Sequence, residues 1–241
     1  HINRIVFASG ATEALNTAVQ GLLKPGSHVI TSGIEHNALW RPLKMLEREG
    51  IVELSVIPCP EGHALDPEEL ANALRDNTAL VAVTHASNVT GAIQPIPQIG
   101  QICREAGIPL LVDGAQTGGV YPIDVDGWNI SLLAFTGHKG LMGPQGTGGL
   151  YIGPELELKP LKYGGTGSAS LPHEMPAWLP DRFEAGTPNG PGIAGLRAAV
   201  KFIIAEGLEQ IRRHELELAA RLQQGLAEIP GVTVYGPADP A

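Results

Sequence analysis

The chain has 241 residues, of which 43% are hydrophobic and 17% charged, enough apolar surface for one large core. A net charge of -9 with no basic stripe argues against nucleic acid as a partner, and the apolar runs are too short to cross a membrane. Only Cys59 and Cys103 are present, far apart, which excludes a disulfide framework and a cysteine zinc site.

Short apolar runs alternate with helical patterns along the first two hundred residues. The apolar runs predict strands, and the amphipathic segments between them predict helices. The strands are expected at 5–8, 28–31, 51–57, 80–84, 110–112, 131–135 and 149–152, and the helices at 12–23, 36–49, 67–75 and 95–105. Because the strands read as apolar on both faces, we expect an α/β fold with a mainly parallel, mixed sheet sandwiched by helices.

The end of the chain has a different pattern. Two helical stretches lie between Gly190 and Ile229 and are broken near Gly207, and Val232–Tyr235 has the composition of a further strand. We expect a large domain over residues 1–206 that is incomplete at its start, a linking helix over 207–230 and the start of a truncated small domain over 231–241. Such a chain would leave apolar surface exposed on its last helix and on 232–234.

Ligands of parallel α/β sheets bind beyond the carboxyl ends of the strands, so polar residues there are candidates for chemistry. The turn Ser9–Glu13 leads from a strand into a helix, and free amides with the Thr12 hydroxyl suit a phosphate; an ordinary helix cap explains it equally well. Asp113 directly follows an apolar strand and needs a cationic partner, with a helix cap as the alternative.

Lys139 is one of six lysines and lies in the glycine-rich turn Thr136–Gly140 after a strand. A desolvated lysine can attack a carbonyl carbon, although most lysines are simply solvated. His36 and His85 each follow a strand, where a lone histidine is more often structural. No zinc-binding set, nucleophile elbow or phosphate-binding P-loop is found.

These clusters together match one kind of site. A lysine for a Schiff base, an aspartate for a pyridinium nitrogen, a helix start for a phosphate and a histidine able to stack are what a pyridoxal phosphate site requires. Their joint occurrence at strand ends weakens the separate structural interpretations.

The same motifs resemble a known family. They are Gly10–Asn16, Glu35-His36, Thr84–Gly91, Val112–Gln116, Thr136–Lys139 and Arg182–Asn189. From Arg4 to about Pro237 the sequence resembles the cysteine desulfurase and selenocysteine lyase family, in the class V aminotransferase group of fold-type I pyridoxal phosphate enzymes. The resemblance implies the large domain of that fold.

The resemblance also implies roles for single residues. Lys139 would carry the cofactor as a Schiff base and move protons, and His36 would stack on the ring and assist proton transfer. Asp113 would pair with the pyridine nitrogen, and Gln116 would contact the phenolic oxygen. Asn88 would face the substrate carboxylate. The phosphate would be held by Ala11, Thr12, Thr136 and His138, and by Thr187 reaching the neighbouring subunit of a homodimer.

The implied activity is removal of sulfur or selenium from L-cysteine or selenocysteine, leaving alanine and an enzyme persulfide. A sulfur-acceptor protein and a cytoplasmic location would follow. In the family the persulfide cysteine and a carboxylate-binding arginine lie in the C-terminal region, beyond residue 241, so Cys59 and Cys103 are expected to be structural.

Several alternatives stay open at this point. A class V aminotransferase or a β-eliminating lyase would use the same cofactor site. The chain would otherwise be an inactive fragment that serves as a binding or scaffold module. Flavodoxin-like nucleotide binding is disfavoured by the lack of a GxGxxG motif and by Lys139 itself.

Overall fold

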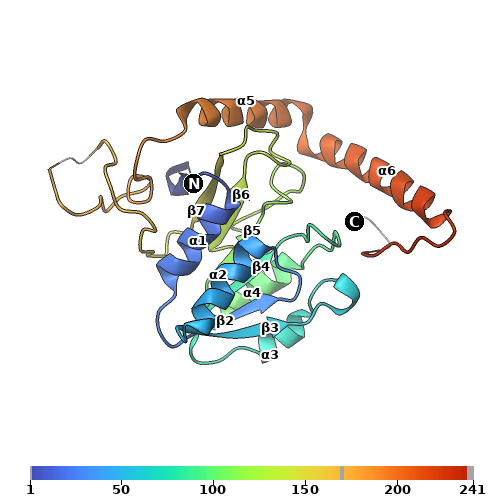
Figure 1. Ribbon diagram of the computed structural model, residues 1–241, viewed down its shortest axis with the longest axis horizontal. Helices are drawn as coiled ribbons and strands as arrows, with labels where there is room; N and C mark the ends of the chain where they lie inside the picture. Colours follow the sequence, from blue (N-terminus) through green and yellow to red (C-terminus); the bar gives the residue numbers. More distant parts are fainter. Residues whose placement is uncertain (1, 169–170, 238–241) are drawn as a thin grey trace.

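A computed structural model describes residues 2–168 and 171–237 and contains one seven-stranded sheet with helices packed on it (Figure 1). The strands lie close to where the apolar runs predict them. They are β1 (Ile5–Ala8), β2 (Ser27–Ser32), β3 (Val52–Ile57), β4 (Thr78–Thr84), β5 (Leu110–Asp113), β6 (Leu132–Thr136) and β7 (Gly148–Ile152).

The helices also follow the predicted pattern. They are α1 (Ala11–Leu22), α2 (Asn37–Arg48), α3 (Pro67–Asn72), α4 (Ile96–Ala106), α5 (Gly190–Glu206) and α6 (Leu208–Ala227), with short 3-10 turns η1 (Ile2–Arg4) and η2 (Pro60–Gly62). Helix α3 begins as its sequence indicates, because the Asp66 side chain accepts a hydrogen bond from the Glu68 backbone N–H.

The strand order is β1-β7-β6-β5-β4-β2-β3. Strand β7 runs antiparallel to both of its neighbours, and the other neighbouring pairs are parallel, so the predicted mixed, mainly parallel sheet is confirmed. The expectation that every strand is buried on both faces is wrong for the two edges. Ile5 and Phe7 on β1 are 37% and 38% exposed, and Glu53 and Val56 on β3 are exposed, because an edge strand lacks a neighbour on one side.

Two hydrophobic cores lie on opposite faces of the sheet. Alternate residues along a strand point to opposite faces, so Val29 packs into the core under α1 and α2, while Ile30 packs into the core under α3 and α4. Adjacent residues Leu80 and Val81 of β4 divide in the same way. The helices therefore cover both faces, as the sequence predicts, and the strand ends remain for a site.

The C-terminal helices lie outside this sandwich (Figure 1). Gly207, with φ +87°, separates α5 from α6, where the break is predicted. Helix α6 has no buried residue, and Leu218 and Leu222 are 49% and 64% exposed, which confirms the expected apolar surface. No helix in the described part of the chain is both long and apolar enough to span a bilayer.

The strand predicted at Val232–Tyr235 is wrong, because the structure has no strand there. A strand needs a neighbour to accept its backbone hydrogen bonds, and none pairs with this segment among the residues described. Residues 238–241, the end of the predicted 231–241 segment, lie outside the described residues. The proposed division into domains stays a prediction.

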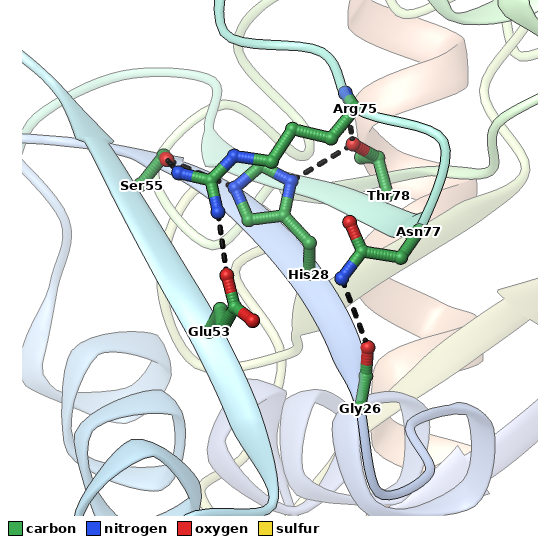
Figure 2. Close-up of polar contacts among 7 residues, drawn as sticks. All are labelled: Gly26, His28, Glu53, Ser55, Arg75, Asn77 and Thr78. Carbon is green, nitrogen blue, oxygen red and sulfur yellow. Dashed lines mark hydrogen bonds and ion pairs between the residues drawn. The ribbon is translucent and has the colours of Figure 1, made fainter.

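The amino edge of the sheet is closed by a polar network around a buried histidine (Figure 2). His28 on β2 is fully buried, and its two ring nitrogens share hydrogen bonds with Thr78 Oγ1 at 2.8 Å and Ser55 Oγ at 2.9 Å. Arg75 donates to Ser55 Oγ and to the Glu53 carboxylate. This edge is therefore occupied by structural contacts and lies opposite the strand ends that carry the candidate site.

Candidate functional site

The candidate site lies where three neighbouring parallel strands end. Strands β4, β5 and β6 are adjacent and finish at Thr84, Asp113 and Thr136, and all three residues are buried. Thr84 is in register with Asp113, and Asp113 with Ala134. The parallel direction of the strands thus brings polar residues far apart in sequence to one edge of the sheet.

Asp113 is a buried carboxylate with cationic groups nearby. It is 3% exposed, and its Oδ1 accepts a hydrogen bond from the Ala115 backbone N–H at 2.9 Å. Burial raises the pKa of Asp113, while that hydrogen bond and the charges of Lys139 and His36 lower it. These two residues therefore lie within electrostatic reach of Asp113, as the predicted site requires.

The alternative interpretation of Asp113 as a helix cap is not supported. The segment that follows it forms turns rather than a helix. Its second oxygen, Oδ2, has no hydrogen-bond partner within residues 2–168 and 171–237. The carboxylate thus keeps one oxygen for a further donor.

Lys139 lies in a tight turn directly after β6. The backbone N–H of Met142 donates to its carbonyl oxygen at 2.8 Å, and Gly143 N–H donates to the Gly137 carbonyl at 2.6 Å, which closes the turn. Lys139 is half-buried, and its ammonium group forms no ion pair with the described residues. The turn thus presents an uncommitted amine near Asp113.

The start of α1 faces the end of β6. Its cap is Gly10, and no side chain caps the helix, so the amides of Ala11 and Thr12 are left for another acceptor. Ser9 does not cap the helix as the alternative supposes. Its N–H and Oγ both donate to Glu13 Oε2, each at 2.7 Å.

Close backbone approach joins this helix start to β6 and β7. A side-chain carbon on Gly148 would lie 2.6 Å from the Gly10 Cα, and one on Gly10 would lie 3.5 Å from Thr136 Oγ1. Thr136 Oγ1 in turn shares a hydrogen bond with His138 Nδ1 at 3.0 Å. The predicted phosphate residues at the start of α1 and in the β6 turn therefore lie close together.

His36 stands at the start of α2 with its ring exposed. Its Nδ1 accepts a hydrogen bond from the Ala38 backbone N–H at 3.0 Å, so the ring caps the helix. The same residue lines a hollow with Thr12, Asn16 and Arg41. The cap fixes the orientation of the ring and leaves Nε2 free of that role.

His85 takes the structural role that the sequence allowed for it. It is 1% exposed, shares a hydrogen bond with Thr117 Oγ1 at 2.9 Å, and meets the rings of Tyr121 and Trp128 edge-on. Burial, with the charge of Arg212, lowers its pKa to about 4. His85 is therefore neutral and is part of the packing directly after the end of β4.

The side chains of three further predicted residues form no hydrogen bond or ion pair with Asp113 or Lys139 among the described residues. Gln116 is half-buried and lines a pocket formed with Tyr121 and Arg212 of α6. Thr187 is exposed and lines a hollow with Ser9, just before the start of α1, while Asn88 is exposed in the loop after β4. Their assigned contacts with cofactor, substrate and partner subunit stay predictions.

Glu35 is a site residue to which the sequence pattern assigns no role of its own. Its carboxylate is joined to Ser32 Oγ at 2.5 Å and accepts from the Thr84 backbone N–H at 2.8 Å. In the sequence, only the position of Glu35 between a buried strand and His36 indicates that it belongs to the site. The bond to Thr84 spans 49 residues and depends on strand order.

The aminotransferase class-V family matches the chain over residues 1–241. The chain belongs to this family. Among curated relatives, the cysteine desulfurase IscS of Methanosarcina thermophila is 39% identical over 238 residues, which is 97% of this chain and 55% of the relative. A cysteine desulfurase of Salmonella typhimurium is 39% identical over 244 residues, covering 97% of this chain and 60% of the relative.

Solved structures give the same result for the fold. The apo structure of a cysteine desulfurase from Thermococcus onnurineus NA1 has a TM-score of 0.92 at 35% identity, covering 100% of this chain and 61% of that one. The cysteine desulfurase CsdA from Escherichia coli has a TM-score of 0.87 at 30% identity, covering 96% and 60%. The class V family chain thus has the fold-type I architecture and spans 55% to 61% of the length of these relatives.

Proposed function

We propose that the protein to which this chain belongs is a pyridoxal phosphate-dependent cysteine desulfurase. It would remove sulfur from L-cysteine, or selenium from selenocysteine, to leave alanine and an enzyme persulfide. One observation carries the proposal. Lys139 and His36 lie within electrostatic reach of Asp113 at the carboxyl ends of the strands, in a chain whose relatives bear the name cysteine desulfurase.

The residues present supply the charges and hydrogen-bond donors that the cofactor needs. Asp113 Oδ2 has no partner among the described residues and suits a pyridinium N–H. The uncapped start of α1, with Thr136 and His138 beside it, supplies amide and side-chain donors for a phosphate. Lys139 supplies an amine with no competing ion pair in the described part of the chain.

Each residue of this set has a definite task in the proposed reaction. Lys139 would hold the cofactor and carry the proton to and from the substrate α-carbon. Asp113 would keep a proton on the ring nitrogen, and the His36 ring, held by its helix cap, would lie against the cofactor. When bound, pyridoxal phosphate supplies an electron sink for the carbanion chemistry.

The acceptor thiol is not assigned to either cysteine of this chain. Cys103 is fully buried, and burial raises its pKa to about 12. Cys59 is half-buried in the turn after β3, where its Sγ contacts the Ile57 carbonyl and the Gln94 amide. The S–S bond of a persulfide would thus form on a thiol elsewhere in the protein.

The proposal includes partners and location. A homodimer would place Thr187 of one subunit at the phosphate of the other, and a sulfur-acceptor protein would receive the persulfide sulfur. The exposed position of Thr187 beside α1 supports the first of these. A cytoplasmic location belongs to the same proposal.

The first test is cofactor binding by the full-length protein. We expect wild-type protein to show an absorbance band at wavelengths longer than its own aromatic absorption, because the cofactor is attached to Lys139. Lys139→Ala should abolish the band and the release of sulfide from L-cysteine. Lys159→Ala, on an exposed lysine far from the site in sequence, serves as the control and should keep both.

The second measurement separates the activities that share this site. With a thiol reductant added to release sulfide from the enzyme persulfide, sulfide formation from L-cysteine is compared with amino transfer to a keto acid in the same preparation. Sulfide and alanine in equal amounts support the desulfurase. Amino transfer without sulfide would support an aminotransferase, sulfide with pyruvate a β-eliminating lyase, and a wild-type protein with no bound chromophore would contradict the proposal.

A further inference from the structure

Glu35 continues the hydrogen bonding between β2 and β4 after the backbone ladder has ended. The last registered pair of these strands is Thr31 with Ala82, and β2 stops at Ser32. Beyond it, Glu35 Oε2 accepts from the Thr84 backbone N–H at 2.8 Å, and Oε1 bonds to Ser32 Oγ at 2.5 Å. A side-chain carboxyl thus takes the place of a missing backbone carbonyl.

The residue that Glu35 binds is itself tied to Asp113. Thr84 is in register with Asp113 on β5, and the next backbone N–H, that of His85, donates to the Asp113 carbonyl at 2.9 Å. Glu35 also directly precedes His36 in the chain. One carboxyl group therefore links the segment that carries His36 to the strand end that positions Asp113.

The charge around this carboxyl favours its neutral form. Glu35 has no salt bridge within the described residues, whereas Asp113 has the charges of Lys139 and His36 near it. Burial raises the pKa of Glu35 to about 8, its hydrogen bonds to Ser32 and Thr84 oppose this, and the Asp113 charge adds to it. The half-buried carboxyl of Glu35 and the buried carboxyl of Asp113 compete for ionisation, and the cations favour Asp113 as the ionised one.

We propose that Glu35 is a positioning residue of the cofactor site, a neutral carboxyl that holds the end of β4 against the His36 segment and leaves the negative charge on Asp113. This inference deepens the proposed function and rests on it for the identity of the cofactor. It assigns no contact between Glu35 and the cofactor or the substrate.

The matched variants Glu35→Gln and Glu35→Ala in the full-length protein test the linking role. Glutamine preserves both bonds of a neutral carboxyl, because its oxygen accepts from Thr84 N–H and its amide donates to Ser32 Oγ. We expect the pyridoxal phosphate dissociation constant of the glutamine variant to stay within about twofold of wild type. Alanine leaves the buried Thr84 N–H without a partner and should weaken binding by about tenfold or more.

The pH dependence of unfolding of the cofactor-free protein is a second readout. A side chain that does not titrate would leave this pH dependence unchanged. A pKa that is raised on folding gives stability that is complete below the unfolded value of 4.5, so the wild type should lose stability from there up to about pH 8 and change little above it. The glutamine variant cannot ionise there. Its unfolding temperature relative to wild type should therefore increase between pH 6 and pH 9.

The outcomes separate this inference from the proposed function. A glutamine variant that binds the cofactor as poorly as alanine, or an unfolding difference that is constant between pH 6 and pH 9, would show an ionised Glu35 and overturn the inference. A wild type that binds no pyridoxal phosphate would overturn the proposed function alone. The unfolding comparison needs no cofactor and still decides the protonation of Glu35.

Discussion

Burial separates two histidines that are part of the packing from His36, which is accessible for chemistry. His28 and His85 are fully enclosed with hydroxyl partners, and burial lowers the pKa of both, so the neutral ring is part of the packing. His36 is exposed at the start of α2, with one nitrogen used by the helix cap. The three residues are alike in sequence context, since each lies in or just after a strand, and differ only in their surroundings.

The His28 network of Figure 2 should make folding sensitive to acid. Burial, with the nearby charge of Arg75, lowers the pKa of His28 below its ordinary value of 6.5, so the native state binds its proton less readily than the unfolded chain. The contribution of His28 to the free energy of unfolding should thus be complete above pH 6.5 and decrease as the pH falls below that value. Denaturant unfolding between pH 7.5 and pH 5 measures this.

The variant His28→Gln isolates the contribution of this ring. It should cost about 1–3 kcal/mol at pH 7.5, because at least one buried hydroxyl bond is lost. The deficit should shrink toward pH 5, where the wild type is penalised by protonation and glutamine is not. A deficit that is the same at both pH values would contradict the assignment of a neutral His28.

At the scale of elements, the site depends on how closely one helix start approaches two strands. Helix α1 begins at Gly10 and packs by its apolar face against the sheet, with Leu15 and Val19 fully buried. Its first turn meets β7 at Gly148 and the end of β6 at Thr136. This close approach at the predicted phosphate site is possible because Gly10 and Gly148 carry no side chain.

Gly148→Ala should therefore disturb the close approach between α1, β6 and β7. The added carbon would lie 2.6 Å from both the Gly10 Cα and the Phe135 carbonyl oxygen, so α1 or β6 must shift. We expect a loss of about 1–3 kcal/mol in the free energy of unfolding and a weaker cofactor affinity. Gly165→Ala, with nothing within 4 Å of the added carbon, is the matched control and should leave both unchanged. Equal behaviour of the two variants would argue against the close approach.

At the scale of the whole molecule, the apolar surface is unevenly distributed. The two cores beside the sheet are closed, whereas α5, α6 and the segment after them expose large apolar side chains. These include Phe202, Ile204, Leu218, Leu222, Val232 and Val234, which are between 42% and 75% exposed. Exposed apolar side chains in such number are typical of a face that another part of a protein or a partner covers.

The isolated 241-residue chain should therefore self-associate. The double substitution Leu218→Gln with Leu222→Gln should reduce association in sedimentation velocity without lowering the unfolding temperature, because both residues are exposed. Leu15→Ala, in the closed core, is the contrast. It should cost about 2–5 kcal/mol and leave a folded chain's association unchanged. A stable, monodisperse monomer of the unaltered chain would contradict this expectation.

The sequence by itself determined the elements and the type of chemistry. Short, mostly apolar runs place every strand from β1 to β7 near its observed bounds, because a strand that packs against a core must carry apolar residues on at least one face. Asp113 and Lys139 stand out because a carboxylate and an amine after such runs must lie at one edge of a parallel sheet. The strand predicted at 232–235 is wrong. Its composition favours a strand, but a strand also needs a neighbouring strand with which to form backbone hydrogen bonds.

Only the tertiary structure decided how these parts meet. The antiparallel β7, the exposed edge strands and the division between the structural His85 and the accessible His36 all depend on neighbours distant in sequence. The bond from Glu35 to Thr84 exists because β2 and β4 are adjacent although β3 lies between them in the chain. Local patterns set which backbone and side-chain groups need partners, and strand order sets which partners are within reach.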